Sequence, residues 1–495
     1  MYIYFELKKN ATKNPNKIAL IFNDERISYL ELYNKVNKLI FFFKKFKLKK
    51  KEKIGLIENN SLEFILILFA ASYLELIIVP FNTKNDLNDI CRNFKTAKIN
   101  YLISWFKFIN FFKKELKLKL FFSIGEKLKG AIYFNDFETI KNKTLNYQIK
   151  KRNSDYLILF SSGSTQEPKP VLIDQKNKLI RCKETSKLYK IKSHDIIPTT
   201  CPIDHSLGLR ILFLSLLNGG TCVLIDTFTP YLYCKLNENY KFTFAILVAS
   251  QINQITKFNK NLKSLKLLKG IVSASSKLTK NLKKRLIRNK ILIYEMYGAS
   301  EVGTIASINL KKNEKQIESV GRAYGKINLK ILSDSNKICK EYETGEIICK
   351  SKMLFNGYLS LYKKELYLYK NNYFRTGDMG YLDDQGFLYY IGRKKNIIKR
   401  SGYMIYPEEI EIKIQKIKNV KDISVHGKFD DKISNEKICF FVILKDDKKI
   451  NRSNFSTKIY KILNHFQLPN KIMYLKKFPK TSLGKVSKPG LMKLI

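Results

Sequence analysis

The sequence is poor in arginine, acidic residues, histidine and tryptophan. Of its 92 basic residues only 12 are arginine, and they face 43 acidic residues, four histidines and one tryptophan. The eight cysteines lie far apart, with no C-x-x-C pair and no histidine cluster nearby, which excludes a zinc framework or a disulfide scaffold. We therefore expect reduced thiols. The N-terminus also lacks the basic, apolar and small-residue pattern of a secretory signal, so a cytoplasmic protein is expected.

A long uninterrupted apolar run is missing as well. The most apolar stretch, Phe64 to Pro80, is shorter than the ~20 residues that a membrane-spanning helix needs, and it contains Glu75. It predicts a buried helix followed by a short strand from Ile77 to Val79. No transmembrane segment is expected.

What the sequence does contain is enough apolar material for two domains. The chain has 495 residues, of which 45% are hydrophobic, and this length exceeds what one ordinary core holds. Short β-type runs alternate with helical stretches, which predicts a large N-terminal α/β domain of layered sheets and helices. Examples of these runs are Lys53 to Ile57, Tyr156 to Phe160, Thr221 to Ile225 and Ile291 to Tyr294.

The residue pattern changes near Gly392, where a strand-like run gives way to a basic segment, and we place a hinge there. We predict a first domain over residues 1–391 and a small mobile α+β domain over residues 392–495. In the small domain, proline followed by two glutamates predicts a helix starting at Pro407. A strand is expected from Lys437 to Leu444.

The formal net charge of +49 would ordinarily indicate a nucleic acid or an anionic membrane as partner. The lysines are spread along the whole chain, however, and do not form clusters. Lysine, asparagine, isoleucine and phenylalanine share A/T-rich codons, so a biased base composition explains the charge more economically. We expect no specific nucleic-acid partner, and salt-sensitive binding would be the sign of one.

A hydroxyl-rich turn follows an apolar strand in the segment LILFSSGSTQEPKPV (157–171). Backbone N–H groups, hydroxyls and a lysine in such a turn can wrap a triphosphate. On composition alone, a turn of this kind after a strand is more often an ordinary loop. The candidate phosphate-binding residues are Ser161, Ser162, Gly163, Ser164, Thr165 and Lys169.

Further segments favour the phosphate-binding interpretation over an ordinary loop, because in order and spacing they resemble the adenylate-forming, AMP-binding superfamily. This superfamily includes acyl-CoA synthetases, luciferases and the adenylation domains of peptide synthetases. The resemblance covers nearly the whole chain. Its motifs here are the loop above, RISYLEL (26–32), VPFN (79–82), YGASE (297–301), YFRTGD (373–378), the hinge segment 392–411 and PKTSLGK (479–485).

The resemblance implies a role for each matched residue on the nucleotide. The loop from Ser161 to Lys169 would hold the β and γ phosphates of ATP, and Glu301 with Thr165 would hold Mg²⁺, a cation that prefers carboxylate oxygen. Tyr297 would stack on adenine beside Gly298, Ala299 and Ser300. Asp378 would accept hydrogen bonds from the ribose hydroxyls.

The resemblance also implies two catalytic orientations of the small domain. Arg393 would assist at the ribose or the phosphates, and Lys485 would bridge the substrate carboxylate and the α-phosphate during adenylation. Lys395 matches the position where the family pivots this domain. After the pivot, the hairpin from Lys399 to Tyr403, which contains Gly402, would line a tunnel for the pantetheine arm of coenzyme A.

His205, in the segment CPIDHSLGL, resembles a family histidine beside the acyl pocket and the thiol entrance. A structural histidine is the alternative interpretation, because one imidazole without an identified partner does not decide the role. We group it with Lys485, Glu301 and Thr165 as the candidate catalytic set, as a pocket residue and not as a base.

The sequence departs from the family at three places. Gln166 and Pro170 replace glycines of the phosphate loop, and SASSKL (273–278) replaces a glycine-rich segment. Glycine permits backbone dihedrals that glutamine resists and proline forbids. These departures predict a reshaped loop or weaker ATP binding.

The predicted function is ATP-dependent activation of a carboxylic acid to an acyl-adenylate, followed by thioester formation with coenzyme A. A fatty or other apolar acid is the default substrate. An acyl carrier protein in place of coenzyme A and a decayed homologue that only binds ligands are the alternatives.

Overall fold

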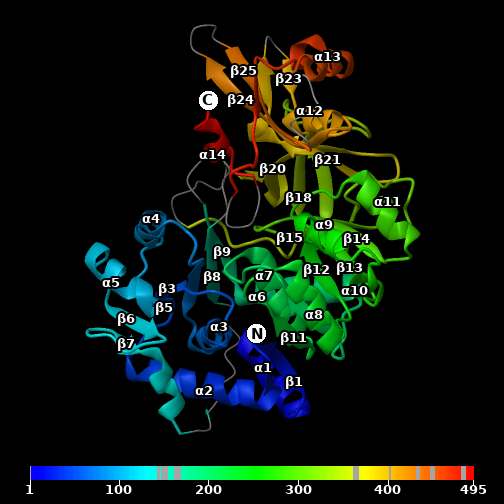
Figure 1. Cartoon of the computed structure of the whole chain (residues 1–495). Coiled ribbons are helices and arrows are strands. Elements are labelled where there is room, and N and C mark those ends of the chain that lie inside the picture. The colour runs from blue at the N-terminus through cyan, green and yellow to red at the C-terminus, as the bar shows by residue number, and fades with distance from the viewer. Residues whose placement is uncertain are drawn as a thin grey trace. The chain divides into compact units, whose positions relative to one another are not determined.

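The computed structural model (Figure 1) describes residues 2–141, 145, 154–160, 169–359, 367–400, 403–430, 435–445, 452–480 and 486–495. These residues form two compact units. The first lies within Met1–Ser162, Pro168–Ile327 and Ser351–Leu366, and the second includes Asn328–Lys350 and Tyr367–Ile495.

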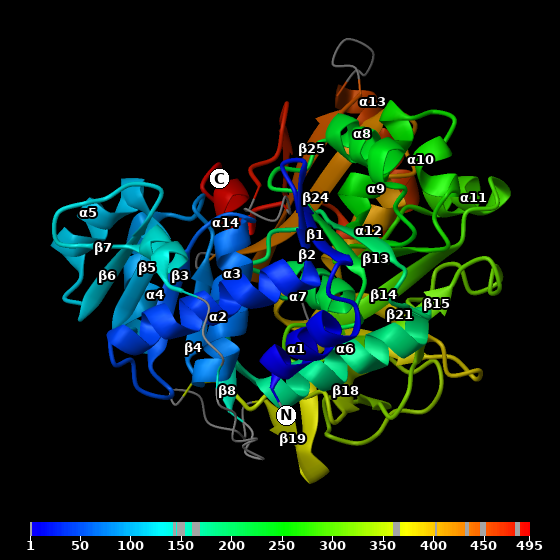
Figure 2. The same ribbon diagram turned by 90° about the horizontal axis from the view of Figure 1, so that it is seen from below.

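The first unit contains a seven-stranded sheet in the order β7-β6-β5-β3-β4-β8-β9. Neighbouring strands are parallel except β8 and β9, which are antiparallel. A parallel sheet has to be covered on both faces, and Figure 2 shows α2 and α3 side by side next to it. The strands are β3 (Lys53–Ile57), β4 (Ile77–Phe81), β5 (Tyr101–Trp105), β6 (Leu120–Ile124), β7 (Ile132–Tyr133), β8 (Asp155–Phe160) and β9 (Pro170–Asp174).

Two smaller sheets complete the first unit. One has the order β10-β11-β1-β2 and the other β12-β13-β14-β15-β16. Their strands are β1 (Ile18–Phe22), β2 (Glu25–Ser28), β10 (Ile196–Thr199), β11 (Thr221–Leu224), β12 (Ala245–Val248), β13 (Ile271–Ala274), β14 (Ile293–Ala299), β15 (Gly303–Asn309) and β16 (Arg322–Ala323).

Side-chain caps mark where several helices of this unit begin. Ser28 and Glu31 form a reciprocal capping box at the start of α2, within the RISYLEL segment. Asp174 accepts from the Asn177 N–H at the start of α6, the helix that follows β9. The helices are α1 (Ile3–Lys13), α2 (Tyr29–Lys45), α3 (Leu62–Leu74), α4 (Leu87–Ala97), α5 (Phe106–Glu115), η1 (Phe134–Thr139), α6 (Gln175–Tyr189), α7 (Ser206–Leu216), α8 (Pro230–Tyr240), α9 (Ala249–Phe258), α10 (Lys263–Lys266) and α11 (Lys280–Arg288).

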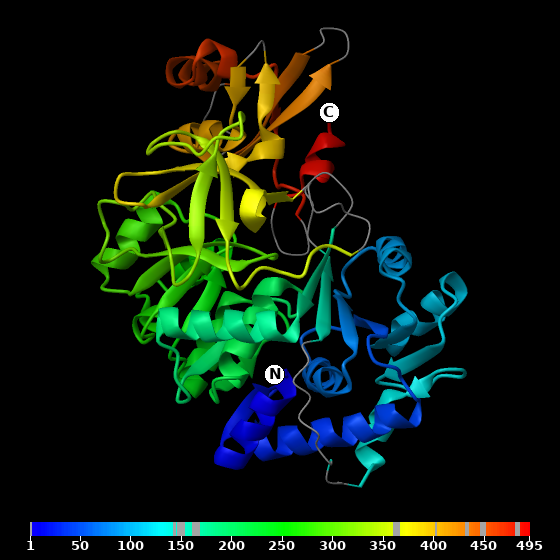
Figure 3. The same ribbon diagram turned by 180° about the vertical axis from the view of Figure 1, so that it is seen from behind.

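The second unit is built from short helices and from strands that pair antiparallel, except for the parallel pair β25 and β26. Strands β17, β18, β20 and β19 form one sheet with β21 paired to β20, β22 and β23 form a hairpin, and β24-β25-β26 form a third sheet. In Figure 3 these strands run from yellow-green to orange. The elements are β17 (Asn328–Leu332), β18 (Gly345–Lys350), β19 (Leu368–Tyr369), η3 (Lys370–Asn372), β20 (Tyr373–Leu382), β21 (Leu388–Arg393), η4 (Lys394–Asn396), β22 (Ile398–Arg400), β23 (Tyr403–Ile405), α12 (Pro407–Ile414), β24 (Val420–Asp430), β25 (Asn435–Leu444), α13 (Arg452–Ile462), η5 (His465–Gln467), β26 (Lys471–Tyr474) and α14 (Lys488–Met492).

The apolar stretch near residue 70 has the structure that its pattern predicts. It forms α3, which is buried continuously from Phe64 to Ser72, and the fully buried strand β4. The helix predicted at Pro407 begins there with proline in its first turn, and the strand predicted from Lys437 lies inside β25. Among the described residues, no helix combines the length and the apolar character needed to cross a bilayer.

The predicted domain boundary at residue 392 falls inside the second unit. Strands β17 to β21 group with the C-terminal segment by contact, whereas the sequence prediction places them in the first domain. Contacts within one conformation do not report where a domain pivots. The boundary at 392 and the pivot at Lys395 therefore remain predictions.

Candidate active site

Strands β8 and β9 flank the predicted phosphate loop. Phe160 pairs with Pro170 in their antiparallel ladder, so the loop joins two paired strands. Pro170 is the first residue of the edge strand β9, a position at which a missing N–H is tolerated. The departure at Pro170 is thus compatible with the strand. The residues Ser161, Ser162, Gly163, Ser164, Thr165 and Gln166 lie outside the described part of the chain.

Two predicted site residues, Lys169 and Glu301, meet at one tyrosine. The Tyr358 hydroxyl donates to Oε1 of Glu301 over 2.8 Å. The Lys169 ammonium lies 5.4 Å from the centroid of the same ring, within the range of a cation–π contact. A cation from the end of the phosphate loop and the predicted metal carboxylate therefore contact the same side chain.

The backbone beside Glu301 is anchored by Arg181 of α6, a side chain only 4% exposed. Its Nε donates to the Met353 carbonyl and its Nη1 to the Ser300 carbonyl, each over 2.9 Å. Nη2 donates to the Glu301 carbonyl over 2.5 Å. Three charge-assisted hydrogen bonds fix this turn more firmly than neutral ones would.

Tyr297, Gly298 and Ala299 form the end of β14. A Cβ added to Gly298 would lie 2.1 Å from the carbonyl oxygen of Gly303 on β15, so only glycine fits there. Gly298 thus allows β14 to approach the neighbouring strand β15 closely. The predicted contacts of Tyr297 and its neighbours with adenine remain predictions.

The segment SASSKL keeps a glycine-like backbone without glycine. Ser275 has a φ of 69°, a conformation that costs a side-chain-bearing residue about 1 kcal/mol. The Leu278 N–H donates to Oε1 of the buried Glu295 over 3.0 Å, and Glu295 also forms a buried ion pair with Lys283. This departure from the family therefore preserves the turn and anchors it to β14.

His205 precedes α7 and lies against Asp204. Its Nε2 is 3.3 Å from Oδ2 of Asp204, and the Asn82 amide donates to the other oxygen of that carboxylate over 3.1 Å. Asn82 belongs to VPFN, so two separate motifs of the sequence are in contact. Asn60 further fixes the preceding loop by accepting from the Ile203 N–H over 2.8 Å.

In the second unit, Asp378 and Arg393 form a cross-strand ion pair. They are register partners on β20 and β21, with Arg393 Nε 2.8 Å from Oδ1 of Asp378. Asp378 is 2% exposed, and Arg393 Nη1 also donates to the Thr376 carbonyl over 3.2 Å. The structure thus brings together the two residues that the sequence assigns to the ribose region.

Two glutamates, the buried Glu346 and the half-buried Glu408, contact the segment predicted as the hinge. Glu346 accepts from Arg375 and from Lys394, the latter over 3.4 Å. Glu408 lies so close to Gly392 that an added Cβ would be 2.4 Å from its Oε2. Burial, together with the nearby charge of Asp378, raises the pKa of Glu408.

The remaining predicted residues of the second unit divide into two groups. Lys399 is exposed on β22 and its N–H donates to Glu436. Gly402 and Lys485 lie outside the described residues.

A comparison with known protein families agrees with this arrangement of the predicted site residues. Residues 7–359 match the family of AMP-binding enzymes. The chain belongs to this family. The resemblance to adenylate-forming enzymes of the acyl-CoA synthetase type is confirmed, and with it the prediction of an acid–thiol ligase.

Relatives of this AMP-binding enzyme align over nearly its full length. A 2-succinylbenzoate–CoA ligase of Oceanobacillus iheyensis is 25% identical, covering 98% of this chain and 98% of the relative. An indoleacetate–CoA ligase of Aromatoleum aromaticum is 24% identical, covering 99% and 97%.

Solved structures show the same fold. The o-succinylbenzoate CoA synthetase of Bacillus subtilis, in complex with its acyl-adenylate intermediate, superposes with a TM-score of 0.88 at 20% identity over 99% of this chain and 98% of that one. ATP-bound MatB of Rhodopseudomonas palustris gives 0.90 at 18% identity over 100% and 99%. The predicted combination of a large α/β part and a smaller C-terminal part is confirmed.

The described residues fit a metal ion that is bound partly by the protein and partly by the phosphates of a nucleotide. Within the described ranges, no group of three or more histidine, cysteine, aspartate or glutamate side chains could hold a metal by itself. Mg²⁺ is usually held by one or two carboxylates together with substrate phosphates, and the Glu301 carboxylate beside Lys169 fits that mode. When bound, the ion would neutralise charge on the phosphates.

Sequence reasoning missed Tyr358, Arg181 and Asp204. Tyr358 is one of 29 tyrosines and had no signal of its own. Arg181 did have one, because arginine is rare in this lysine-rich chain, and a rare arginine indicates a need for its fixed fork of donors.

Proposed function

We propose that this AMP-binding enzyme converts an aryl carboxylic acid into its coenzyme A thioester, using ATP and Mg²⁺. The meeting of Lys169 and Glu301 at Tyr358 supports this most directly. Adenylation releases pyrophosphate, whose growing negative charge requires a cation and a metal-binding carboxylate close together.

The reaction has two steps. A carboxylate oxygen of the acid attacks the α-phosphorus of ATP, which forms an acyl-phosphate bond while the bond to pyrophosphate breaks. The thiol of coenzyme A then loses its proton and attacks the acyl carbonyl, so that a carbon–sulfur bond forms and AMP leaves.

Separate residues serve the two steps. In the first, Tyr297 with Gly298, Ala299 and Ser300 contacts adenine, Asp378 and Arg393 contact the ribose, and Lys485 bridges the acid and the α-phosphate. In the second, rotation at Lys395 brings the hairpin with Lys399 and Gly402 to the thiol. His205 lies at the acyl pocket.

An aryl acid is favoured over a fatty acid. Two relatives that align over nearly the full length of the chain are named for 2-succinylbenzoate and indoleacetate, both of which contain an aromatic ring. The expectation of a fatty acid rested only on the absence of an identified polar pocket. Coenzyme A is preferred to a carrier protein as acceptor for the same reason, because both relatives are named as CoA ligases.

ATP–pyrophosphate exchange on the purified full chain tests the proposal. The panel contains aryl acids, short and long fatty acids and amino acids, and each active acid is then assayed with coenzyme A and with a carrier protein. Exchange with aryl acids and thioester formation on coenzyme A are expected. Exchange with fatty acids alone would contradict the proposed substrate class, and silence from a folded protein would favour a decayed homologue.

Lys485→Ala separates the two steps. It should abolish exchange while sparing thioester formation from chemically synthesised acyl-adenylate, since the lysine acts only in adenylation. Equal loss of both steps would show that Lys485 has a different role.

A further inference from the structure

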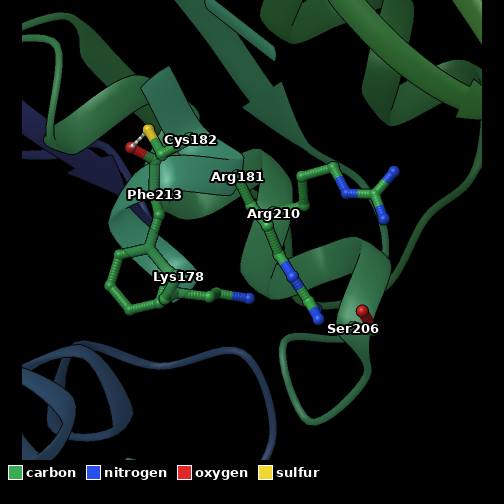
Figure 4. A pocket seen from close by; sticks show the side chains of 6 residues that line it. All are labelled: Lys178, Arg181, Cys182, Ser206, Arg210 and Phe213. Carbon is green, nitrogen blue, oxygen red and sulfur yellow. Dashed lines mark hydrogen bonds between the residues drawn. The ribbon is translucent and has the colours of Figure 1, made fainter. Parts of the chain in front are cut away.

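A small hollow between α6 and α7 is lined by three positive side chains among its six lining residues. Helix α6 contributes two of the three cations and α7 the third (Figure 4). The lining residues are Lys178, Arg181, Cys182, Ser206, Arg210 and Phe213.

Lys178 is the least expected of these residues. It is only 4% exposed, and the structure gives its ammonium no hydrogen-bond acceptor and no acidic partner among the described residues. Its Nζ lies 5.4 Å from the centroid of the Phe213 ring. The ammonium points into the hollow (Figure 4). Burial, and then the charges of Arg181 and Arg210, lower its pKa well below the ordinary value.

The two arginines differ in how many of their side-chain nitrogens donate hydrogen bonds within the protein. Arg181 uses each of its three nitrogens on a backbone carbonyl. Arg210 uses Nη1 on Thr304 and Met296, over 3.1 and 3.2 Å, and no bond from its Nε or Nη2 is present among the described residues. Lys178 and Arg210 therefore keep donors for a ligand, while Arg181 adds charge.

A buried cation without a counter-ion is costly, so a site of this kind is kept where a ligand supplies the opposite charge. We propose that Lys178 and Arg210 bind a second carboxylate of the acid substrate, distant from the carboxylate that is adenylated. This inference rests on the proposed function and narrows its substrate class to dicarboxylic aryl acids.

The position of the hollow favours the acid over the nucleotide as the source of the anion. Ser206 in its lining follows His205, the residue that the sequence places at the acyl pocket. Arg181 reaches from the hollow to the carbonyls of Ser300 and Glu301, at the nucleotide turn. The hollow thus borders the segments between which the acyl group would lie, and the phosphates already have the loop that ends at Lys169.

A matched pair of acids tests the inference in the full chain. The first is 2-succinylbenzoate, and the second is 4-oxo-4-phenylbutanoate, which lacks only the ring carboxylate. The wild-type protein should use the first with a kcat/KM at least about 30-fold higher, the usual scale for a charged hydrogen bond. Benzene-1,2-dicarboxylate against benzoate provides a second pair.

Three variants of α6 test whether Lys178 itself gives the preference for the dicarboxylate. Lys178→Met should abolish the preference, mainly by raising KM for the dicarboxylate, and should leave the monocarboxylate nearly unaffected. Lys178→Arg, which restores the charge, should recover much of the preference. Lys183→Met removes an exposed lysine of the same helix and should change neither acid.

The outcomes separate this inference from the proposed function. Exchange with monocarboxylates that equals or exceeds that with dicarboxylates overturns the subsite and leaves the function intact, and so does equal loss of both acids in a folded Lys178→Met protein. If no acid supports exchange, calorimetric titration with 2-succinylbenzoate decides: binding that Lys178→Met abolishes supports the subsite, and no binding overturns it. Displacement by inorganic pyrophosphate but by no dicarboxylate would assign the hollow to phosphate and also overturn it.

Discussion

The Tyr358 hydroxyl lies 2.8 Å from Oε1 of Glu301 and donates a hydrogen bond to it. The two residues are 57 positions apart in the chain, and nothing in the local sequence links them. The contact fixes the orientation of a carboxylate that would otherwise rotate, and the ring of the same tyrosine lies against the ammonium of Lys169.

Tyr358→Phe should slow ATP–pyrophosphate exchange about tenfold and raise the Mg²⁺ concentration needed for half-maximal rate. The substitution keeps the ring under Lys169 but removes a hydrogen bond to a charged group, worth about 1.5 kcal/mol. Tyr369→Phe is the control, since it removes a hydroxyl bonded to the Asn336 carbonyl in the other unit. An unchanged Mg²⁺ dependence would remove Tyr358 from the metal site.

Arg181→Lys should lower both the unfolding midpoint and the exchange rate. Lysine retains the charge, but its three donors leave from one nitrogen and cannot reach carbonyls spaced around the three nitrogens of a guanidinium, so buried acceptors lose their partners at about 1–3 kcal/mol each. Arg285→Lys is the matched control, because Arg285 is exposed and donates to two carbonyls. If Arg181→Lys has native stability and rate, the arginine does not position the turn at Ser300.

Asp378→Asn should weaken ATP binding about tenfold or more while the chain remains folded. Asparagine has nearly the same shape but lacks the charge that pairs with Arg393 and that suits an acceptor of two ribose hydroxyls. Equilibrium binding of ATP measures the effect, with the exposed Asp384→Asn as control. Unchanged affinity would make the ion pair purely structural.

The second unit should lose stability in mild acid because of His426. Burial and the nearby charge of Lys488 lower the pKa of His426 to about 4 from 6.5, and Ser424 bonds its Nε2 over 2.9 Å. Between these values the unfolded chain binds a proton that the folded protein does not. The free energy of unfolding should therefore fall as the pH drops from about 6.5 to 4, by up to about 1.4 kcal/mol per pH unit.

Urea unfolding of wild-type protein and His426→Gln across this range isolates that contribution from other titrating groups. The two curves should converge as the pH falls, whereas the exposed His465→Gln should run parallel to the wild type. A constant difference between wild type and His426→Gln would contradict the shifted pKa.

Much of the candidate site follows from local sequence. The phosphate loop is predicted from a strand, a hydroxyl-rich turn and a lysine only when these are combined with the other motifs of the family resemblance, whereas the buried runs of α3 and β4 follow from their composition alone. Such features depend on residues that are neighbours in the chain, so their chemistry is readable without the fold. The pairing of Asp378 with Arg393 can be predicted almost as readily from the sequence, because the two residues lie on either side of a single turn between antiparallel strands.

Other features depend on which distant segments meet, and only the tertiary structure decided them. Tyr358, Arg181 and Asp204 are defined by what they contact across the chain. Lys178 is the clearest case: among 80 lysines, taken as 92 basic residues minus 12 arginines, it is distinguished only by burial at 4% exposure beside two arginines. By itself the sequence determined the family and the order of its motifs. The environment of a charged side chain depends on the packing of non-adjacent helices, and that environment was set by the fold.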